Sequence, residues 1–180
     1  MPRSPLRLAA LLLPSLLGLL AAPPAIADDG DPAGWSVRTD PRRRAFLIVT
    51  ERAGGPRLLT FACLRDADSF AVYAAGLPDL PPDAGHIGLV LRVADAEWPI
   101  YGSTGTDPDG GGTMFSSEWD LDAGERKRLA AGLLPVLRAP GPVAVTIGDA
   151  PTIEIPLEAL PPRAGIAKPL KTFESVCFGK

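Results

Sequence analysis

The chain contains few of the residues from which ordinary catalytic and metal sites are built. It has one histidine, His86, and two cysteines, Cys63 and Cys177. Zinc sites need several His or Cys ligands, so we expect no metal site of that kind. The sequence also lacks a Gly-Lys-Ser/Thr phosphate-binding loop and a G-x-S-x-G nucleophile elbow, the common signatures of nucleotide-binding proteins and serine hydrolases. We therefore expect no bound cofactor and no enzymatic activity.

Basic side chains are outnumbered by acidic ones. The chain has 18 Lys and Arg against 21 Asp and Glu, a formal net charge of −3. Proteins bind nucleic acid chiefly by neutralising its phosphates with Lys and Arg, so we expect no nucleic-acid partner. The dense basic runs, Arg42-Arg43-Arg44 and Arg126-Lys127-Arg128, are typical of solvated turns and helix faces.

Long apolar runs are confined to the N-terminus. Arg3 and Arg7 precede an apolar segment from Leu8 to Ala22, and Ala25-Ile26-Ala27 supplies small residues at the −3 and −1 positions that a signal peptidase requires. This pattern predicts a signal peptide over residues 1–27. The protein is therefore expected to be exported and to be periplasmic or secreted.

An uncleaved membrane anchor is the alternative interpretation of this segment. The apolar run is shorter than the roughly 20 residues that a membrane-spanning helix requires, and it contains Pro14 and Gly18. Cleavage is the favoured interpretation, with no stable membrane insertion afterwards. We expect a flexible polar leader over residues 28–34 and a single domain over residues 35–180, since about 150 residues is a usual size for one core. Loss of Arg3 and Arg7 with the signal peptide takes the formal net charge from −3 to −5.

Export changes the meaning of the two cysteines. In an oxidising compartment Cys63 and Cys177 are expected to form a structural disulfide. It would close a loop with 113 intervening residues, positions 64 to 176, worth about 4–5 kcal/mol in the chain-entropy model. Pairing with another protein and a catalytic cysteine remain as alternatives.

The central part of the sequence has the alternating pattern of β-strands. Trp35-Ser36-Val37 is expected to open the ordered domain, and several strands follow, separated by turn residues. The expected strands are Ala45–Glu51, Leu58–Leu64, Phe70–Ala74, His86–Ala94, Glu97–Gly102 and Met114–Trp119, with Glu97–Gly102 as the hairpin partner of His86–Ala94. Gly102-Ser103-Thr104-Gly105 is interpreted as a turn, and residues 104–113 as a flexible glycine-rich loop.

One amphipathic helix is predicted over residues 123–134. Asp122 is its expected N-cap, with Glu125 in the capping-box position, and Pro135 is expected to end or kink it. The sequence then predicts short strands at Val143–Ile147 and Thr152–Ile155 and helical turns at Leu157–Leu160 and Pro169–Val176. The expected fold class is a mainly antiparallel, β-sandwich-like domain with one or two helices, stapled by one disulfide.

The glycine-rich segment suggests two kinds of chemistry. Asp107, Asp109, Gly112 and Glu118 fall at positions 1, 3, 6 and 12 of a calcium-loop template, but a glycine stands at position 5, where an oxygen ligand is needed, so a plain surface loop is favoured. Acidic pairs, namely Glu118 with Asp120 and Asp66 with Asp68, are the residue types used in acid/base hydrolysis. Nothing in the sequence selects one pair.

Two aromatic residues and the histidine complete the candidates. Trp98 and Trp119 flank the glycine-rich segment and are a candidate partner-binding rim, with core packing as the alternative. His86 could act as a general base, but no partner is recognisable by spacing, and a structural or merely exposed histidine is favoured.

The order of these elements resembles that of a group of small exported β-rich bacterial proteins. The shared features are the opening Trp35, a strand ending in a cysteine over Leu59–Cys63, a Leu91-Arg92-Val93 strand, a late helix and hairpin, and a C-terminal Phe-x-x-x-Cys from Phe173 to Cys177. The chain resembles accessory proteins of the type VI secretion system of the VasI kind and, more distantly, the invasion-associated locus B family. This resemblance covers most of the mature chain. It implies a periplasmic β-sandwich with one disulfide and a role in binding or assembly.

The sequence therefore leads to two functional hypotheses. The favoured one is a non-enzymatic binding or accessory protein of the cell envelope, whose partner is an envelope or secretion protein. The alternative is a periplasmic hydrolase that uses acidic residues near the segment 104–113.

Overall fold

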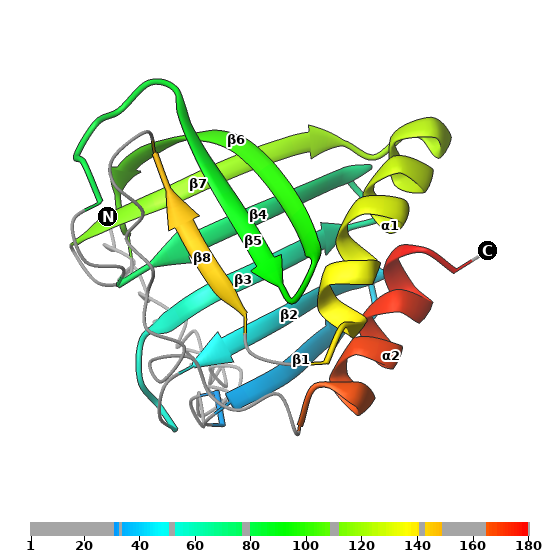
Figure 1. The fold of residues 1–180 in the computed structure, drawn as a ribbon. Helices are drawn as coiled ribbons and strands as arrows, with labels where there is room; N and C mark the ends of the chain where they lie inside the picture. Colours follow the sequence, from blue (N-terminus) through cyan, green and yellow to red (C-terminus); the bar gives the residue numbers. More distant parts are fainter. Residues whose placement is uncertain are drawn as a thin grey trace, which may run out of the picture.

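The structure is a computed structural model that describes residues 31–32, 34–50, 53–76, 80–108, 112–140, 143–148 and 165–179. Within these ranges the chain forms eight strands and two helices (Figure 1). Their bounds are β1 Gly34–Asp40, β2 Arg44–Thr50, β3 Arg57–Leu64, β4 Ser69–Ala75, β5 Ile87–Val93, β6 Ala96–Thr106, β7 Thr113–Asp120, α1 Ala123–Arg138, β8 Ala144–Ile147 and α2 Ala167–Cys177. The predicted fold class, a single mainly antiparallel β domain with helices and one disulfide, is confirmed.

All strands belong to one curled sheet in the order β1-β2-β3-β4-β7-β6-β5-β8. The first four strands form a meander, and β5, β6 and β8 cross in front of it (Figure 1). The 11-residue strand β6 makes this possible because it pairs with β5 through Ala96–Gly102 and with β7 through Ser103–Thr106. A strand that passes from one layer to the other forms the corner of a sandwich.

The expected turn at Gly102–Gly105 is therefore wrong, since these residues lie inside β6. Gly102 occupies the point where β6 passes closest to β7. A Cβ atom there would collide with the carbonyl oxygen of Ser116 and would lie 2.8 Å from Cζ of Phe115. The glycine is needed for close approach of two backbones rather than for a turn.

The core lies between the two layers of the curled sheet and under both helices. Strand β5 shows how the sequence forms this core, because Ile87, Leu89, Leu91 and Val93 are all buried and alternate with half-buried residues. The largest buried side chains include four phenylalanines from different elements: Phe61, Phe70, Phe115 and Phe173. Alternation along β5 thus sends one face of this strand into the core, whereas β3 and β4 are buried along almost their whole length.

Helix α1 packs against β5 and β6. Its N-cap is the predicted one, because the Asp122 carboxylate accepts a hydrogen bond of 2.7 Å from the backbone N–H of Glu125. The helix does not end near residue 134 but continues through Pro135 to Arg138. The proline is tolerated because Val136 and Leu137 remain buried in the core, and their burial offsets the lost backbone hydrogen bond.

Helix α2 covers β1 and β2 and is tied to the sheet by the predicted disulfide between Cys63 of β3 and Cys177. Neither cysteine side chain is accessible to solvent. Arg65, two residues after Cys63, donates a 3.0 Å hydrogen bond to the carbonyl oxygen of Cys177, placing a cation at the negative end of the helix dipole. An Arg138–Glu174 ion pair of 2.7 Å joins α2 to α1.

Several sequence predictions lie outside the described residues. These are the signal peptide 1–27, the strand Thr152–Ile155 and the helical turn Leu157–Leu160. From the predicted flexible leader the structure describes Asp31, which is 5% exposed and forms ion pairs of 2.6 Å with Arg38 and 2.8 Å with Arg57.

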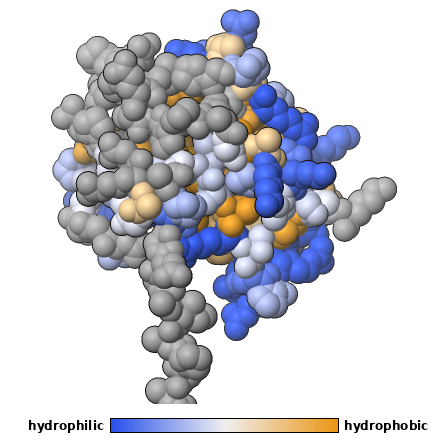
Figure 2. All heavy atoms as spheres, turned by 90° about the horizontal axis from the view of Figure 1, so that it is seen from below, coloured by the Kyte–Doolittle hydropathy of each residue, from blue (hydrophilic) through white to orange (hydrophobic). Residues whose placement is uncertain are grey.

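No helix in the described ranges is long and apolar enough to cross a membrane. Seen from below the view of Figure 1, hydrophilic side chains surround the apolar side chains that are visible among the described residues (Figure 2).

Candidate functional site

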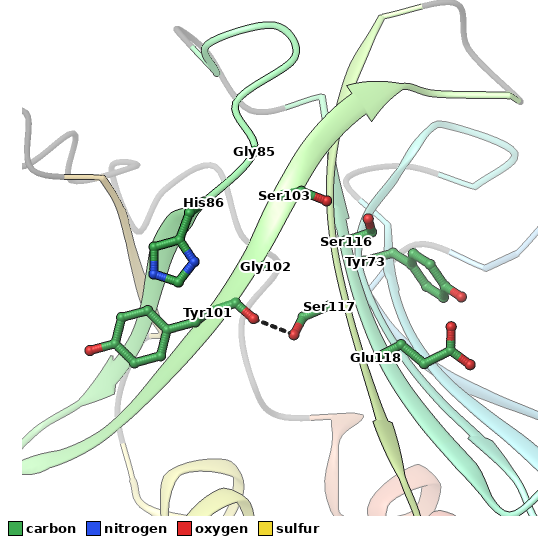
Figure 3. A pocket seen from close by; sticks show the side chains of 9 residues that line it. All are labelled: Tyr73, Gly85, His86, Tyr101, Gly102, Ser103, Ser116, Ser117 and Glu118. Carbon is green, nitrogen blue, oxygen red and sulfur yellow. Dashed lines mark hydrogen bonds between the residues drawn. The ribbon is translucent and has the colours of Figure 1, made fainter.

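A groove of about 460 Å³ lies at the corner of the sheet, where β6 passes between the two layers. Its size falls within the roughly 300–1,000 Å³ typical of small-ligand sites. Strand β6 runs through the middle of the groove, with one set of side chains on either side (Figure 3). The residues that line it are Tyr73, Gly85, His86, Tyr101, Gly102, Ser103, Ser116, Ser117 and Glu118.

On one side of β6, His86 and Tyr101 form an aromatic stack (Figure 3). Their ring centroids are 5.7 Å apart and the planes differ by 1°. Tyr101 pairs directly with Gly88 in the β5–β6 hairpin, and its ring lies over this glycine, 3.6 Å from the position a Cβ would take. Cross-strand packing of this kind fixes the ring. The Tyr101 side chain nevertheless remains 63% exposed.

The segment before β5 is held in place by Thr104 of β6. The Thr104 hydroxyl donates to the carbonyl oxygen of Pro81 at 2.5 Å and accepts from the backbone N–H of Ala84 at 2.8 Å, while the Thr104 N–H donates to the Ala84 carbonyl at 2.9 Å. Because His86 follows this anchored segment directly, its imidazole is presented beside the groove rather than on a loose loop.

On the other side of β6, a row of hydroxyl groups crosses three strands. Tyr73 of β4 is in register with Ser116 of β7, which is in register with Ser103 of β6. No hydrogen bond joins these three side chains to one another (Figure 3). Their hydroxyls can therefore each donate to and accept from a ligand.

Glu118 lies beside this row on β7. One of its carboxylate oxygens accepts a 2.6 Å hydrogen bond from the hydroxyl of Ser69, which orients the group. Burial raises the pKa of the Tyr73 phenol, and the negative charge of Glu118 raises this pKa further. Tyr73 therefore stays protonated at neutral pH and supplies a hydroxyl donor.

The corner itself is closed by Ser117. Its hydroxyl donates a 2.5 Å hydrogen bond to the backbone carbonyl of Tyr101, which joins β7 to β6 on the floor of the groove (Figure 3). Ser117 is buried, and its role is to hold the two strands together.

Trp98 and Trp119, the predicted partner-binding rim, come together in the structure. Their rings stack with centroids 6.0 Å apart. The ring of Trp119 also packs against that of Phe70 in the core, with centroids 5.8 Å apart. Helix α1 approaches closely at Gly132, where a Cβ would lie 2.9 Å from the Trp98 ring. Both tryptophans are partly buried against the core. They serve packing, and their use as a rim stays a prediction.

The acidic candidates have separate surroundings. Asp66 forms an ion pair of 2.6 Å with Arg44. The side-chain hydrogen bond from Arg44 lowers the pKa of the Asp66 carboxyl. Glu118 lies in the groove, but its predicted partner Asp120 does not line it.

Of the calcium-loop template, Asp109 lies outside the described residues. The last position of the template, Glu118, lies on strand β7 and accepts from Ser69. No group of three potential metal ligands occurs among the residues that the structure describes.

Comparison of the chain with protein-family models, with curated proteins and with solved structures found no match. The chemistry of the groove therefore has to be judged from its own residues.

Proposed function

We propose that this protein is an exported, non-catalytic binding protein of the bacterial cell envelope and that it holds its partner in the groove at β6. This role agrees with the accessory function implied by the resemblance to type VI secretion accessory proteins. The disulfide supports the proposal, because such bonds persist in oxidising compartments such as the periplasm.

The exposure of Tyr101 carries the proposal. It is the one large hydrophobic side chain among the described residues that is exposed, at 63%. A lone exposed aromatic side chain is ordinary on a protein surface, but this one is held by His86 and Gly88 on one side of a groove whose other side carries hydroxyl groups. Fixed aromatic side chains with polar neighbours are typical anchors of binding sites.

Two observations favour binding over the alternative of hydrolysis. Glycosidase-type hydrolysis uses a pair of carboxylates that face each other across the substrate. Among the described lining residues, Glu118 is the one carboxylate. Its hydrogen bond to Ser69 suits a fixed acceptor for a bound ligand.

The experiment is chemical cross-linking in intact cells, followed by capture of the tagged protein and mass spectrometry. We expect an envelope component to be recovered with the native protein and to be lost with Tyr101→Ala. Thr172→Ala, an exposed position on α2, is the matched control and should leave recovery unchanged. Recovery that does not depend on Tyr101 would overturn the proposal.

The same capture tests the tryptophan rim separately. Loss of the partner with Trp98→Ala or Trp119→Ala in a protein that still folds would support a role of these residues. Unchanged capture would leave them with packing alone.

A further inference from the structure

The chemical class of the groove's ligand follows from four features of its lining, and the inference rests on the function proposed above. The first feature is charge. The described lining has one carboxylate, Glu118, and no Lys or Arg. A phosphate, a nucleic acid or an acidic peptide would meet repulsion from Glu118 with no Lys or Arg to offset it. The ligand is therefore neutral or carries positive charge.

The second feature is the pairing of β6 with β7 in the groove, where Ser103–Thr106 lie opposite Thr113–Ser116. Peptides bound in extended form usually add a strand to an exposed edge and gain main-chain hydrogen bonds. Here β6 and β7 already pair with each other, with Ser103 opposite Ser116. At these paired positions recognition comes from side chains.

The third feature is the mixture of hydrogen-bonding groups. Ser103 and Ser116 offer hydroxyls that both donate and accept, Tyr73 offers a protonated phenol, and Glu118 is an acceptor. Hydroxyl groups of a ligand also donate and accept, so a polyhydroxylated molecule can satisfy all of these groups at once. A purely apolar ligand would leave them unpaired at a cost.

The fourth feature is the division of the groove by β6. The Tyr101 ring lies on one side and the hydroxyl row with Glu118 lies on the other (Figure 3). A ligand that contacts both groups therefore has to reach across β6. A ligand that uses the whole groove has at least two linked units, one of which lies against an aromatic face.

We propose that the groove binds a neutral oligosaccharide of the kind found in glycan strands. One sugar ring packs its C–H face on Tyr101, and the neighbouring sugar donates hydroxyl protons to Glu118 and hydrogen-bonds to Ser103, Ser116 and Tyr73. Stacking on Tyr101 supplies affinity, and the hydroxyl row supplies selectivity for a ligand that carries matching hydroxyls.

The test is calorimetric and NMR titration of the purified mature protein with neutral tetrasaccharides: chitotetraose, cellotetraose and maltotetraose. We expect at least one to bind, with shifts in the amide signals of β6 and β7. Tyr101→Ala should weaken binding about tenfold, as expected for loss of one aromatic contact, while Tyr101→Phe should preserve it. Glu118→Gln, which keeps the shape of the side chain, should also weaken binding.

Three outcomes would overturn the ligand class. These are no binding of any of the three at millimolar concentration, binding that survives Tyr101→Ala in a folded protein, or stronger binding of fully deacetylated chitotetraose, which would indicate a cationic ligand. If capture from cells depends on Tyr101 while the oligosaccharides fail, the proposed binding function stands and only the glycan assignment falls. If capture does not depend on Tyr101, the binding function falls as well.

Discussion

Removal of the Cys63–Cys177 disulfide should lower the stability of the domain by a calculable amount. The bridge joins β3 in the middle of the sheet to the last residue of α2, across a sequence separation of 114. In the chain-entropy model a closed loop of this size restricts the unfolded chain by about 5 kcal/mol at room temperature. For a domain of this length, 1 kcal/mol corresponds to roughly 2–4 °C in the melting temperature. The expected loss is therefore roughly 10–20 °C.

The assay is thermal unfolding of the mature protein, followed by circular dichroism, in its oxidised form, in its reduced form and as the Cys63→Ala/Cys177→Ala variant. Because both cysteines are fully buried, reductant alone should act slowly under native conditions, and the reduced sample has to be prepared through unfolding. Reduced protein and variant should melt at similar temperatures, and both should still unfold cooperatively, since Leu170 and Phe173 keep α2 packed on the core. A loss of only a few degrees would refute the entropic account.

Three further predictions concern the site and its supports. Because the protein has two tyrosines, Tyr73 and Tyr101, a Tyr101→Phe variant isolates Tyr73, whose ultraviolet titration should give a pKa above the ordinary value of 10.0. A titration at or below 10.0 would contradict the buried placement of this phenol. Gly102→Ala should destabilise the domain by about 1–3 kcal/mol through overpacking, whereas Gly105→Ala in the same strand, where a Cβ meets nothing within 4 Å, should have far less effect. Equal melting temperatures for the two variants would be inconsistent with the close approach at the corner. Hydrogen bonds from backbone N–H groups lower the pKa of the Asp122 cap, so its contribution to stability is present above pH 3.8 and is lost as the pH falls through the lowered pKa. The acid part of a plot of melting temperature against pH should therefore be flatter for Asp122→Asn. An unchanged slope would show that the Asp122 carboxylate does not contribute to the pH dependence of stability.

Much of the fold could be predicted because short apolar runs are separated by turn residues, and one of them, β5, also alternates clearly. The strand Leu58–Leu64 and its neighbours were placed within a residue or so, since the pattern of buried side chains is local to each strand. Strand β6 was predicted to end at Gly102, because Gly-Ser-Thr-Gly is typical of a turn. Its continuation to Thr106 depends on contact with β7, which no local pattern reveals.

The length of α1 shows a second limit of the same kind. Pro135 is a strong local signal for a helix end. The helix continues to Arg138 because Val136 and Leu137 are buried against the rest of the domain. Tertiary packing thus overrides the local preference.

The candidate site was only partly accessible from the sequence. His86 has no partner recognisable by spacing, because its stack with Tyr101 depends on the exact register of the β5–β6 hairpin. With Val93 opposite Ala96, Tyr101 falls opposite Gly88 and diagonal to His86. The predicted strand ends, Ala94 and Glu97, would instead pair Tyr101 with Val90, so the stack could not be found without the exact position of the turn. The hydroxyl row could not be found this way, because it depends on the pairing of β4, β7 and β6, which are distant in the sequence.

The most direct test of the groove as the binding site is site-specific photo-cross-linking in living cells, with a photoreactive amino acid at position 101 and, in a parallel strain, at position 172 on α2. The account predicts a discrete envelope adduct from position 101 and none from position 172. The same adducts from both positions, or an adduct from position 172 alone, would contradict it.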